Sequence, residues 1–473
     1  MKDNQSIHKR FICLSIFFGM LFILLMPPFQ SPDEDSHFKK AYVIAEGNVF
    51  PDLKDGQTGY YLPTEMVQYM SDVLQANSDL DYKFAYRDII SLEHGITDYS
   101  NRTFEHFSTV STNPIAHIVP AIGIVFGKLI GKIAGITPSF VCLLYFARFA
   151  NLMGYVILVV FSIYLSPVLK KTMSLFGLIP MSLMLGSMVS YDMILISVSF
   201  LYVSLCLRLM YNSDSKWNWR YTVVFTIIAF LFFTIKIIYL PMFLWLLLIL
   251  LQDKDKYKIV KRIIFVLVLF ITLYLLTSVI PGKMTTVVAS ETGTTLVLSP
   301  SQQQLRYVIQ HPIAYMKIFL HTLSVSRNFY ITSTVSLFGL LDTYMFTVFV
   351  YIYAVLLILV GIAEVSIEKI IVKWYYKLSI IFGVLAAFFG AFLAMYIIWT
   401  SLVSGIGASS IEGVQGRYFL PVLFPVTLLF SNQWIAKKKY INLIATKLVE
   451  YSELISVSML SLSMLTILLR FWV

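Results

Sequence analysis

Residues 26–42 read Met26-Pro-Pro-Phe-Gln-Ser-Pro-Asp-Glu-Asp-Ser-His-Phe-Lys-Lys-Ala-Tyr42 and follow the first hydrophobic run of the chain directly. A chain that has just crossed a bilayer would emerge here, so this stretch decides how the rest is arranged. Ser31 is placed to cap a helix over residues 32–46, and Glu34 stands where a capping box supplies its carboxylate. The pattern predicts a short helix at the membrane surface.

Asp33 and Glu34 precede His37 by four and three residues, so the three side chains can share one face of that helix. One interpretation is structural, with the carboxylates capping the helix and complementing its dipole. The other is chemical, with a carboxylate pair and a histidine facing a substrate. The stretch alone does not separate the two interpretations.

The composition indicates a membrane protein with several crossings. Of the 473 residues, 58% are hydrophobic and 13% charged, whereas soluble domains are about one quarter charged. The net charge of +10 comes with no basic stripe interleaved with aromatic residues outside the hydrophobic segments, which argues against a nucleic-acid partner. The three cysteines lie inside apolar runs without disulfide or metal-ligand spacing.

Hydrophobic runs divide the chain into six parts, and they predict an all-α polytopic fold with about eleven transmembrane helices (about 10 to 13). The parts are a cytoplasmic N-terminus at 1–10, a first transmembrane helix at 11–27, an extracytoplasmic loop with juxtamembrane helices at 28–138, a transmembrane bundle at 139–280, a second extracytoplasmic loop with a surface helix near 305–320 at 281–343, and a C-terminal transmembrane bundle at 344–473.

The apolar stretch Pro114–Ile136 is long enough to cross but is interrupted by Pro120, several glycines and two lysines. Basic clusters decide its placement, because they mark the cytoplasmic side. If 114–136 lies along the outer surface or re-enters, every later basic cluster falls in the cytoplasm: Lys170-Lys171, Lys254 to Arg262, Lys369 to Lys377, and Lys437 to Lys439. We therefore expect this stretch not to cross.

Several polar residues fall on the expected outer face. Tyr191 and Asp192 follow a predicted crossing, although Asp192 can equally be an ordinary loop acid. Lys236 lies between two short predicted crossings, 221–233 and 237–251, with Tyr239 nearby. A lysine at this depth either pairs with a carboxylate or binds an anion, unless it extends to the interface as a snorkelling side chain.

A second informative stretch reads Ile411-Glu-Gly-Val-Gln-Gly-Arg-Tyr-Phe-Leu-Pro421. Two glycines permit a tight turn around Gln415, and Arg417 then opens the next crossing. An arginine at a helix start is unfavourable for the dipole, which indicates that an anion holds it. Its planar fork suits phosphate or carboxylate, and contact with lipid headgroups is the alternative.

Residues 28–38 and 413–421 resemble the opening and C-terminal motifs of a bacterial membrane family catalogued as domain of unknown function 2142. Shorter matches follow in the family's order, and the resemblance covers about residues 11–435. These matches are Asn113-Pro114, Arg148 with Asn151, Ser190-Tyr-Asp192, Lys236 with Tyr239 and Pro241, His311-Pro312, and Gly339-Leu-Leu-Asp342. The segment 50–112 is longer than the family pattern.

That family resembles a branch of the GT-C superfamily of membrane glycosyltransferases. The resemblance implies inverting transfer of a sugar from a polyprenyl-phosphate donor to a cell-envelope glycan or lipid-linked acceptor, at the outer face of the bacterial cell membrane. A transporter or flippase for lipid-linked glycans, and a glycan polymerase or ligase, remain alternatives.

Under that resemblance, Asp33 is the expected general base, with Glu34 as its rival and His37 orienting the acceptor. Arg417 and Lys236 are expected to hold the donor phosphate and to lie together with Asp33. The remaining candidates for substrate contact are Tyr191, Asp192, Tyr239 and Gln415. No cofactor is demanded; a divalent metal, if present, would be held by Asp33, Glu34 and Asp192.

Overall fold

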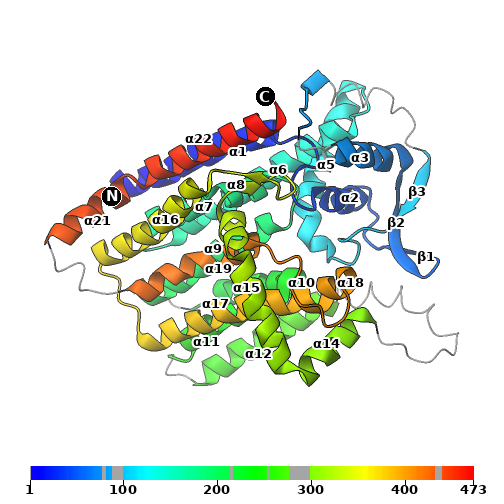
Figure 1. The fold of residues 1–473 in the computed structure, drawn as a ribbon. Helices are drawn as coiled ribbons and strands as arrows, with labels where there is room; N and C mark the ends of the chain where they lie inside the picture. The colour runs from blue at the N-terminus through cyan, green and yellow to red at the C-terminus, as the bar shows by residue number, and fades with distance from the viewer. Residues whose placement is uncertain are drawn as a thin grey trace.

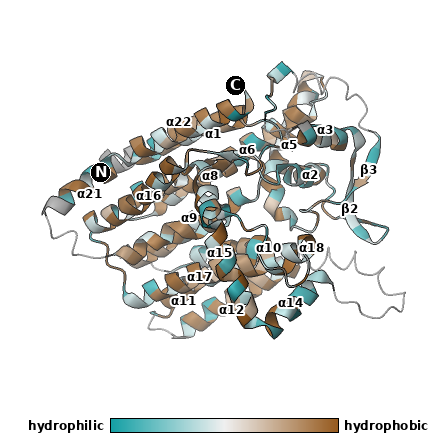
Figure 2. Ribbon diagram, in the orientation of Figure 1, coloured by the Kyte–Doolittle hydropathy of each residue, from teal (hydrophilic) through white to brown (hydrophobic). Residues whose placement is uncertain are grey.

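The computed structural model describes residues 2–76, 81–87, 100–212, 217–252, 256–275, 299–431 and 439–473. Within these ranges the chain is mainly helical with two small antiparallel sheets, and eight helices are long and apolar enough to cross a membrane. Figure 1 shows the long helices side by side, with a smaller lobe at one end. Figure 2 shows hydrophobic residues along those helices and more hydrophilic residues on the strands of the lobe. The predicted all-α polytopic class is confirmed.

The straight crossings are single helices packed against one another. They are α1 (Lys2–Leu25), α6 (Phe140–Leu165), α9 (Asp192–Tyr211), α16 (Thr347–Ile367), α17 (Trp374–Met395, continued by η4, Tyr396–Thr400, and α18, Ser401–Val403) and α22 (Ser452–Phe471). A further helix, α21 (Lys439–Glu450), precedes α22. The end of the predicted crossing 263–280, the start of the loop 281–343, and Lys254, Lys437 and Lys438 lie outside the described residues.

Two predicted crossings correspond to broken helices, and the predicted pair around Lys236 counts as one long apolar segment, so fewer than eleven long helices are found in the described chain. The first consists of α7 (Lys170–Gly177) and α8 (Pro180–Ser187). The second consists of η5 (Gly416–Phe419), α19 (Leu420–Leu423) and η6 (Phe424–Phe430). Prolines interrupt both. Irregular backbone is tolerated at membrane depth only where protein surrounds it, and most of these residues are buried.

The predicted pair of short crossings around Lys236 forms a hairpin. Its limbs are α10 (Trp219–Lys236) and η2 (Ile237–Met242) followed by α11 (Phe243–Leu250). Lys236 itself has extended torsions, φ −147° and ψ 96°. Trp217 and Leu250 line one cavity, whereas a straight helix would separate them by about 50 Å. The chain therefore reverses at Lys236, as predicted.

The two ends of the bundle differ in charge. One end, called the basic end below, carries Lys170, Lys171, Arg208, Lys258, Arg262 and Lys373 on the termini of α7, α9, α12 (Lys256–Tyr274) and α17. The opposite end carries Asp33, the start of α9 and the tip of the α10–α11 hairpin. Because α9 is a single helix of 20 residues, about 27 Å separate Asp192 at one end from Met210 at the other.

The helix α5 (Ile118–Ala134) follows η1 (Pro114–His117) and packs along the first half of α6. A Cβ atom added to Gly123 would lie 2.4 Å from the carbonyl oxygen of Phe146, so the two backbones touch there. Gly154, in the middle of α6, faces Val119 at the start of α5. The helix therefore begins level with the start of α9, where Met193 also contacts Gly154, and runs away from the basic end. Its length and composition would permit a crossing, but its position favours the surface or re-entrant placement.

The lobe beside the bundle contains α2 (Glu34–Ala45), α3 (Thr64–Ala76), α5 and a three-stranded sheet. Its strands are β1 (Asp52–Lys54), β2 (Gln57–Pro63) and β3 (Arg102–Glu105), in the order β1-β2-β3. The helices that the sequence predicts in this loop, over 32–46 and 63–74, correspond to α2 and α3, but the strands were not predicted.

A buried lysine fastens the sheet of the lobe to α2. The ammonium of Lys40 donates to the hydroxyl of Tyr60 at 2.7 Å and to the carbonyl of Val110 at 2.8 Å. Burial lowers the pKa of Lys40 to about 8. At the other end of α2, Arg102 donates to both oxygens of Glu46 at 2.9 and 3.0 Å. These contacts hold α2 against the sheet of the lobe.

The predicted surface helix near 305–320 is in fact two helices, α14 (Pro300–Gln310) and α15 (Pro312–Val335). The second continues well beyond the predicted end and reaches the start of η5, where Ser333 Oγ accepts a hydrogen bond from the Gly416 amide at 2.8 Å. A short hairpin, β4 (Leu337–Phe338) and β5 (Thr343–Tyr344), connects α15 to α16.

Candidate functional site

The loop before α2 separates two neighbouring carboxylates. Asp33 has left-handed torsions, φ 60° and ψ 13°, and makes no side-chain cap. This conformation costs an L-residue about 1–2 kcal/mol. The predicted capping by Ser31 is wrong: its hydroxyl has no hydrogen-bond partner in the described chain, and the helix begins at Glu34. Asp33 and Glu34 therefore do not share a helix face, and each binds a different arginine.

Glu34 forms a fully buried pair with Arg148 of α6, called the buried pair below. The Glu34 oxygens lie 2.6 Å from Nη2 and 2.8 Å from Nε of Arg148, and both side chains are 0% exposed. The Val189 amide also donates to Glu34, at 3.0 Å. Arg148 donates in addition to the carbonyls of Ile23, Met26 and Pro27. This pair fastens α1, α2, α6 and the end of α8 to one another.

Asp33 forms a more open pair with Arg417, called the open pair below. Arg417 Nη2 lies 2.5 Å from Asp33 Oδ2, and Nη1 lies 3.2 Å from Asp192 Oδ2. The Asp33 side chain is 52% exposed, whereas Arg417 is 3% and Asp192 6% exposed. Lys236 Nζ lies 3.5 Å from Asp192 Oδ1 and 3.7 Å from the ring centroid of Tyr418. Segments from α2, α9, α10 and η5 thus meet in one ion cluster, as the sequence predicted for Asp33, Lys236 and Arg417.

Electrostatics keep Asp33 ionised. Burial by itself raises the pKa of Asp33, but the charge of Arg417 and its hydrogen bond outweigh that effect, and His37 and Lys236 act in the same direction. The resulting pKa lies below the ordinary range for an aspartate. At Asp35, two residues along, burial dominates and raises the pKa.

A pair of histidines lies beside the ion cluster. His37 Nδ1 is 2.8 Å from His117 Nε2, and the Tyr191 ring stands edge-on to His37 with the centroids 4.6 Å apart. Burial lowers the pKa of His37 to about 4, despite the neighbouring Asp33 and Asp192. His37 is therefore neutral near pH 7, and one ring nitrogen of the pair donates to the other.

The last two sequence candidates flank Arg417. The hydroxyl of Tyr239 donates to the carbonyl of Tyr418 at 2.7 Å, which holds the backbone next to Arg417. Gln415 precedes η5. Gln415 Oε1 and Arg417 Nε are buried and have no hydrogen-bond partner in the described residues. Unsatisfied polar atoms of this kind are available to a ligand.

The metal set considered from the sequence does not converge. Asp33 and Asp192 face Arg417, but Glu34 is turned to Arg148. Throughout the ranges that the structure describes, no group of three or more His, Cys, Asp or Glu side chains is placed to hold a metal ion.

Sequence reasoning missed His117 and Tyr418 at the site, and it did not identify Arg148 as the partner of Glu34. His117 lies four residues beyond Asn113 and reaches His37, and Tyr418 follows Arg417 directly and covers Lys236. Arg148 was noted only as part of a family pattern. The position of Arg148 inside a hydrophobic run is the one sequence signal that could have predicted a buried carboxylate partner.

The fold and the cluster define a polytopic membrane protein with an ionic site at one end of its helix bundle. The chain belongs to the family described as "Predicted membrane protein (DUF2142)", whose model matches residues 16–426. The matched range includes both stretches that supply the ion cluster. No curated protein and no solved structure gives a significant match to the chain.

Proposed function

We propose that this protein is a membrane glycosyltransferase of the GT-C type that moves a sugar from a polyprenyl-phosphate donor to an acceptor hydroxyl on the extracytoplasmic side. The observation that carries the proposal is the open pair, in which a half-exposed carboxylate and a buried arginine face each other at the end of the bundle. Both site stretches resemble motifs of the family to which the chain belongs, and the resemblance of that family to GT-C glycosyltransferases supports the reaction class.

Arg417 is suited to receive the donor phosphate. Its guanidinium contacts buried Asp192 and half-exposed Asp33, and its Nε has no partner in the described chain. A phosphate would displace Asp33, because half-exposed Asp33 can be hydrated once it is released, whereas displacing Asp192 would take one of two cationic partners from a buried carboxylate. Lys236, held against Asp192, adds a second positive charge.

The reaction needs one base and no covalent intermediate. Asp33 takes the proton of the acceptor hydroxyl while that oxygen attacks the anomeric carbon. The bond from that carbon to the phosphate oxygen breaks, and the electron pair leaves with the lipid phosphate, which Arg417 and Lys236 stabilise. Once the phosphate has replaced Asp33 on Arg417, the pKa of Asp33 rises and the carboxylate becomes a better base.

The other members of the cluster have supporting roles in this proposal. Glu34 is not the base, because Arg148 and the Val189 amide occupy its oxygens. Neutral His37 is placed to orient the acceptor or to relay its proton. The principal alternative, a transporter for lipid-linked glycans, calls for facing ionisable residues at mid-depth. Asp192, Lys236 and Arg417 instead lie at the ends of their helical elements.

The test is donor consumption by the purified full-length protein, reconstituted in liposomes with a panel of polyprenyl-phosphate sugars. Asp33→Asn should lower the rate by about two to four orders of magnitude with unchanged membrane insertion. Asp35→Asn removes the same charge two residues away and should retain activity within about threefold. Full activity of Asp33→Asn with an inactive Glu34→Gln would move the base to Glu34. Activity in both variants would end the mechanism.

Arg417→Lys tests the phosphate assignment separately. Lysine keeps the charge but cannot bind two groups through a planar fork. We expect the KM for the donor to rise by about tenfold, with a smaller change in the KM for the acceptor. Equal KM values in wild type and variant would remove Arg417 from the donor site.

A further inference from the structure

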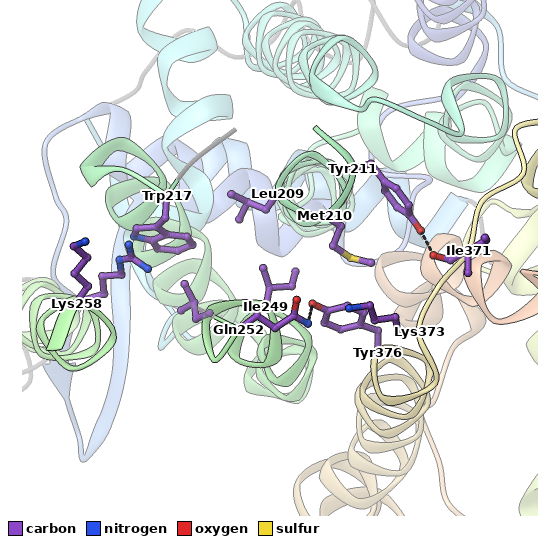
Figure 3. A pocket seen from close by; sticks show the side chains of 12 residues that line it. Leu209, Met210, Tyr211, Trp217, Ile249, Gln252, Lys258, Ile371, Lys373 and Tyr376 are labelled. Atoms are coloured by element: carbon purple, nitrogen blue, oxygen red, sulfur yellow. Dashed lines mark hydrogen bonds between the residues drawn. The ribbon is translucent and has the colours of Figure 1, made fainter. Parts of the chain in front are cut away.

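A cavity of about 690 Å³ lies at the basic end of the bundle, far from the ion cluster. It is lined by the end of α9, the end of α11, the start of α12 and the start of α17, as Figure 3 shows. Its volume is in the range of about 300–1,000 Å³ typical of ligand pockets. Asp192 and Met210 mark the two sites on α9, and about 27 Å of helix separate them.

The mouth of this cavity is cationic. Lys258, Arg262 and Lys373 line it, and none of its described lining residues is acidic. Lys258 and Arg262 are four residues apart on α12 and so lie on one helix face. In Figure 3 Lys258 and Trp217 lie on one side of the cavity, and Lys373 and Tyr376 on the other.

The walls of the mouth are held in place by hydrogen bonds and stacking. Tyr211 donates to the carbonyl of Ile371 at 2.9 Å, and the amide of Gln252 donates to Tyr376. The guanidinium carbon of Arg262 lies 5.7 Å from the ring centroid of Trp217. Stacking on an aromatic face fixes the plane of a guanidinium. The site is therefore preorganised for a phosphate group.

An apolar groove continues from the cationic mouth. A second cavity of about 410 Å³ shares Trp217, Leu250 and Arg262 with the first. Its other lining residues are all apolar, and they come from α10, η2, α11, α12 and α17. On α12 the basic turn at Lys258 and Arg262 is followed by Val266 and Leu267, which face the groove. One charged end joined to one hydrocarbon channel matches an amphipathic ligand.

We propose that these joined cavities bind a membrane lipid bearing a phosphate group, with the phosphate at Arg262, Lys258 and Lys373 and a hydrocarbon chain in the groove. Basic pockets between transmembrane helices on the cytoplasmic side commonly take anionic headgroups. The ligand class follows from charge complementarity and from the continuity of mouth and groove. This site is independent of the proposed glycosyl transfer, because it lies at the other end of α9 and shares no residue with the ion cluster.

Fluorescence quenching by lipids with brominated acyl chains tests the proposal on the full-length protein in neutral detergent. Trp217 lines both cavities, and the difference between wild type and Trp217→Phe isolates its signal among the seven tryptophans. Brominated phosphatidylglycerol should quench Trp217 saturably, and brominated phosphatidylcholine should do so only weakly. Equal quenching by both lipids would overturn the cationic recognition.

Matched charge variants separate the cavity from general surface charge. Arg262→Gln with Lys373→Gln should weaken phosphatidylglycerol binding by about thirtyfold. Lys261→Gln with Lys369→Gln removes equal charge at the same end but outside the cavity lining, and should change binding by less than about twofold. Equal losses in the two double variants would refute a built site.

Val266→Phe keeps all three cations and fills the groove, which keeps the proposal testable if the charge variant does not fold. This variant should weaken binding of phosphatidylglycerol by about tenfold. Unchanged lipid binding in this variant would overturn the groove assignment. Competition against bound brominated phosphatidylglycerol identifies the natural lipid. If polyprenyl phosphate displaces it at a lower concentration than unlabelled phosphatidylglycerol does, the site binds a carrier lipid. If unlabelled phosphatidylglycerol is the better competitor, the site binds a bulk phospholipid. Displacement by inorganic phosphate at comparable concentration would contradict a lipid site.

Discussion

Two adjacent carboxylates in one loop have opposite environments. Glu34 and its arginine are 0% exposed, and Arg148 also donates to three backbone carbonyls at and just after the end of α1. Asp33 is 52% exposed, and its arginine already has a second, buried carboxylate partner in Asp192. The left-handed backbone of Asp33, at the start of α2, directs the two neighbouring carboxylates to different arginines.

The comparison indicates that the buried pair has a structural role, whereas the open pair can exchange a partner. A buried ion pair cannot lose one partner without leaving an uncompensated charge, so the buried pair is fixed in composition. The open pair can lose its Asp33 contact, because Arg417 keeps Asp192 and a new anion can take the vacated position. Strain at Asp33 is consistent with a position selected for chemistry more than for stability.

Glu34→Gln should give the largest effect, because it leaves Arg148 buried without a counter-charge. We expect the free energy of unfolding to fall by about 3–5 kcal/mol, measured by denaturant unfolding of purified protein in detergent. Asp35→Asn, which removes a carboxylate outside both pairs, is the control. A stable but inactive Glu34→Gln protein would reverse the roles assigned to the two carboxylates.

Asp33→Gly should give a much smaller change in stability. Glycine relieves the left-handed strain of about 1–2 kcal/mol, while its greater unfolded-state entropy and the loss of a half-exposed ion pair act in the opposite direction. We expect the free energy of unfolding to stay within about 1 kcal/mol of wild type, although transfer is lost. A drop as large as that of Glu34→Gln would show that the open pair is structural too.

The pH dependence of activity should show the smallest effect. The pKa of Asp33 lies below its ordinary value of about 3.9, and that of His37 is about 4. Both groups therefore keep their charge state from about pH 5.5 to 7, and kcat/KM should vary by less than about twofold there. The depressed pKa of Asp33 stabilises the fold above its unfolded value, and this contribution disappears only as the pH falls through the lower folded value.

A decline of kcat/KM with a midpoint above pH 5 would point to a different carboxyl group. Asp35, whose pKa burial raises, is the neighbouring group with the right direction of shift. Comparing the profiles of wild type and Asp35→Asn would identify it, since the decline would then move or disappear in the variant.

Much of the architecture could be predicted from the sequence, because the signals are local. Hydrophobic run length predicted the membrane class, whereas the inference from lysine and arginine placement that 114–136 does not cross the membrane stays a prediction. Lys236 inside a long apolar run predicted the reversal between α10 and α11. A charge on each of three distant segments, all placed at one bundle end, was enough to predict that Asp33, Lys236 and Arg417 meet.

The roles within the 33–37 stretch could not be predicted, because they depend on partners more than a hundred residues away. The helix rules favour Ser31 as cap and Glu34 as capping-box partner, but a buried arginine outweighs a surface cap and takes Glu34. No rule predicts left-handed torsions at an aspartate followed by glutamate. The pairing of β2 with β3 escaped prediction for a related reason, since it joins residues 60–63 to 102–105 across the chain. The β1–β2 hairpin is local, and the turn signal Asp55-Gly56 could have predicted it.

The α10–α11 hairpin also has a consequence for how the chain enters the membrane. In the orientation predicted from the basic clusters, Lys236 at the tip must be carried across the bilayer during synthesis, at a cost of about 2.5–3.5 kcal/mol. Each leucine, isoleucine, phenylalanine or valine makes the free energy of insertion more favourable by about 0.3–0.6 kcal/mol, so roughly ten such residues offset one lysine. The limbs contain that many, so both can insert together as one unit and deliver the cation to the far side without help from the rest of the bundle.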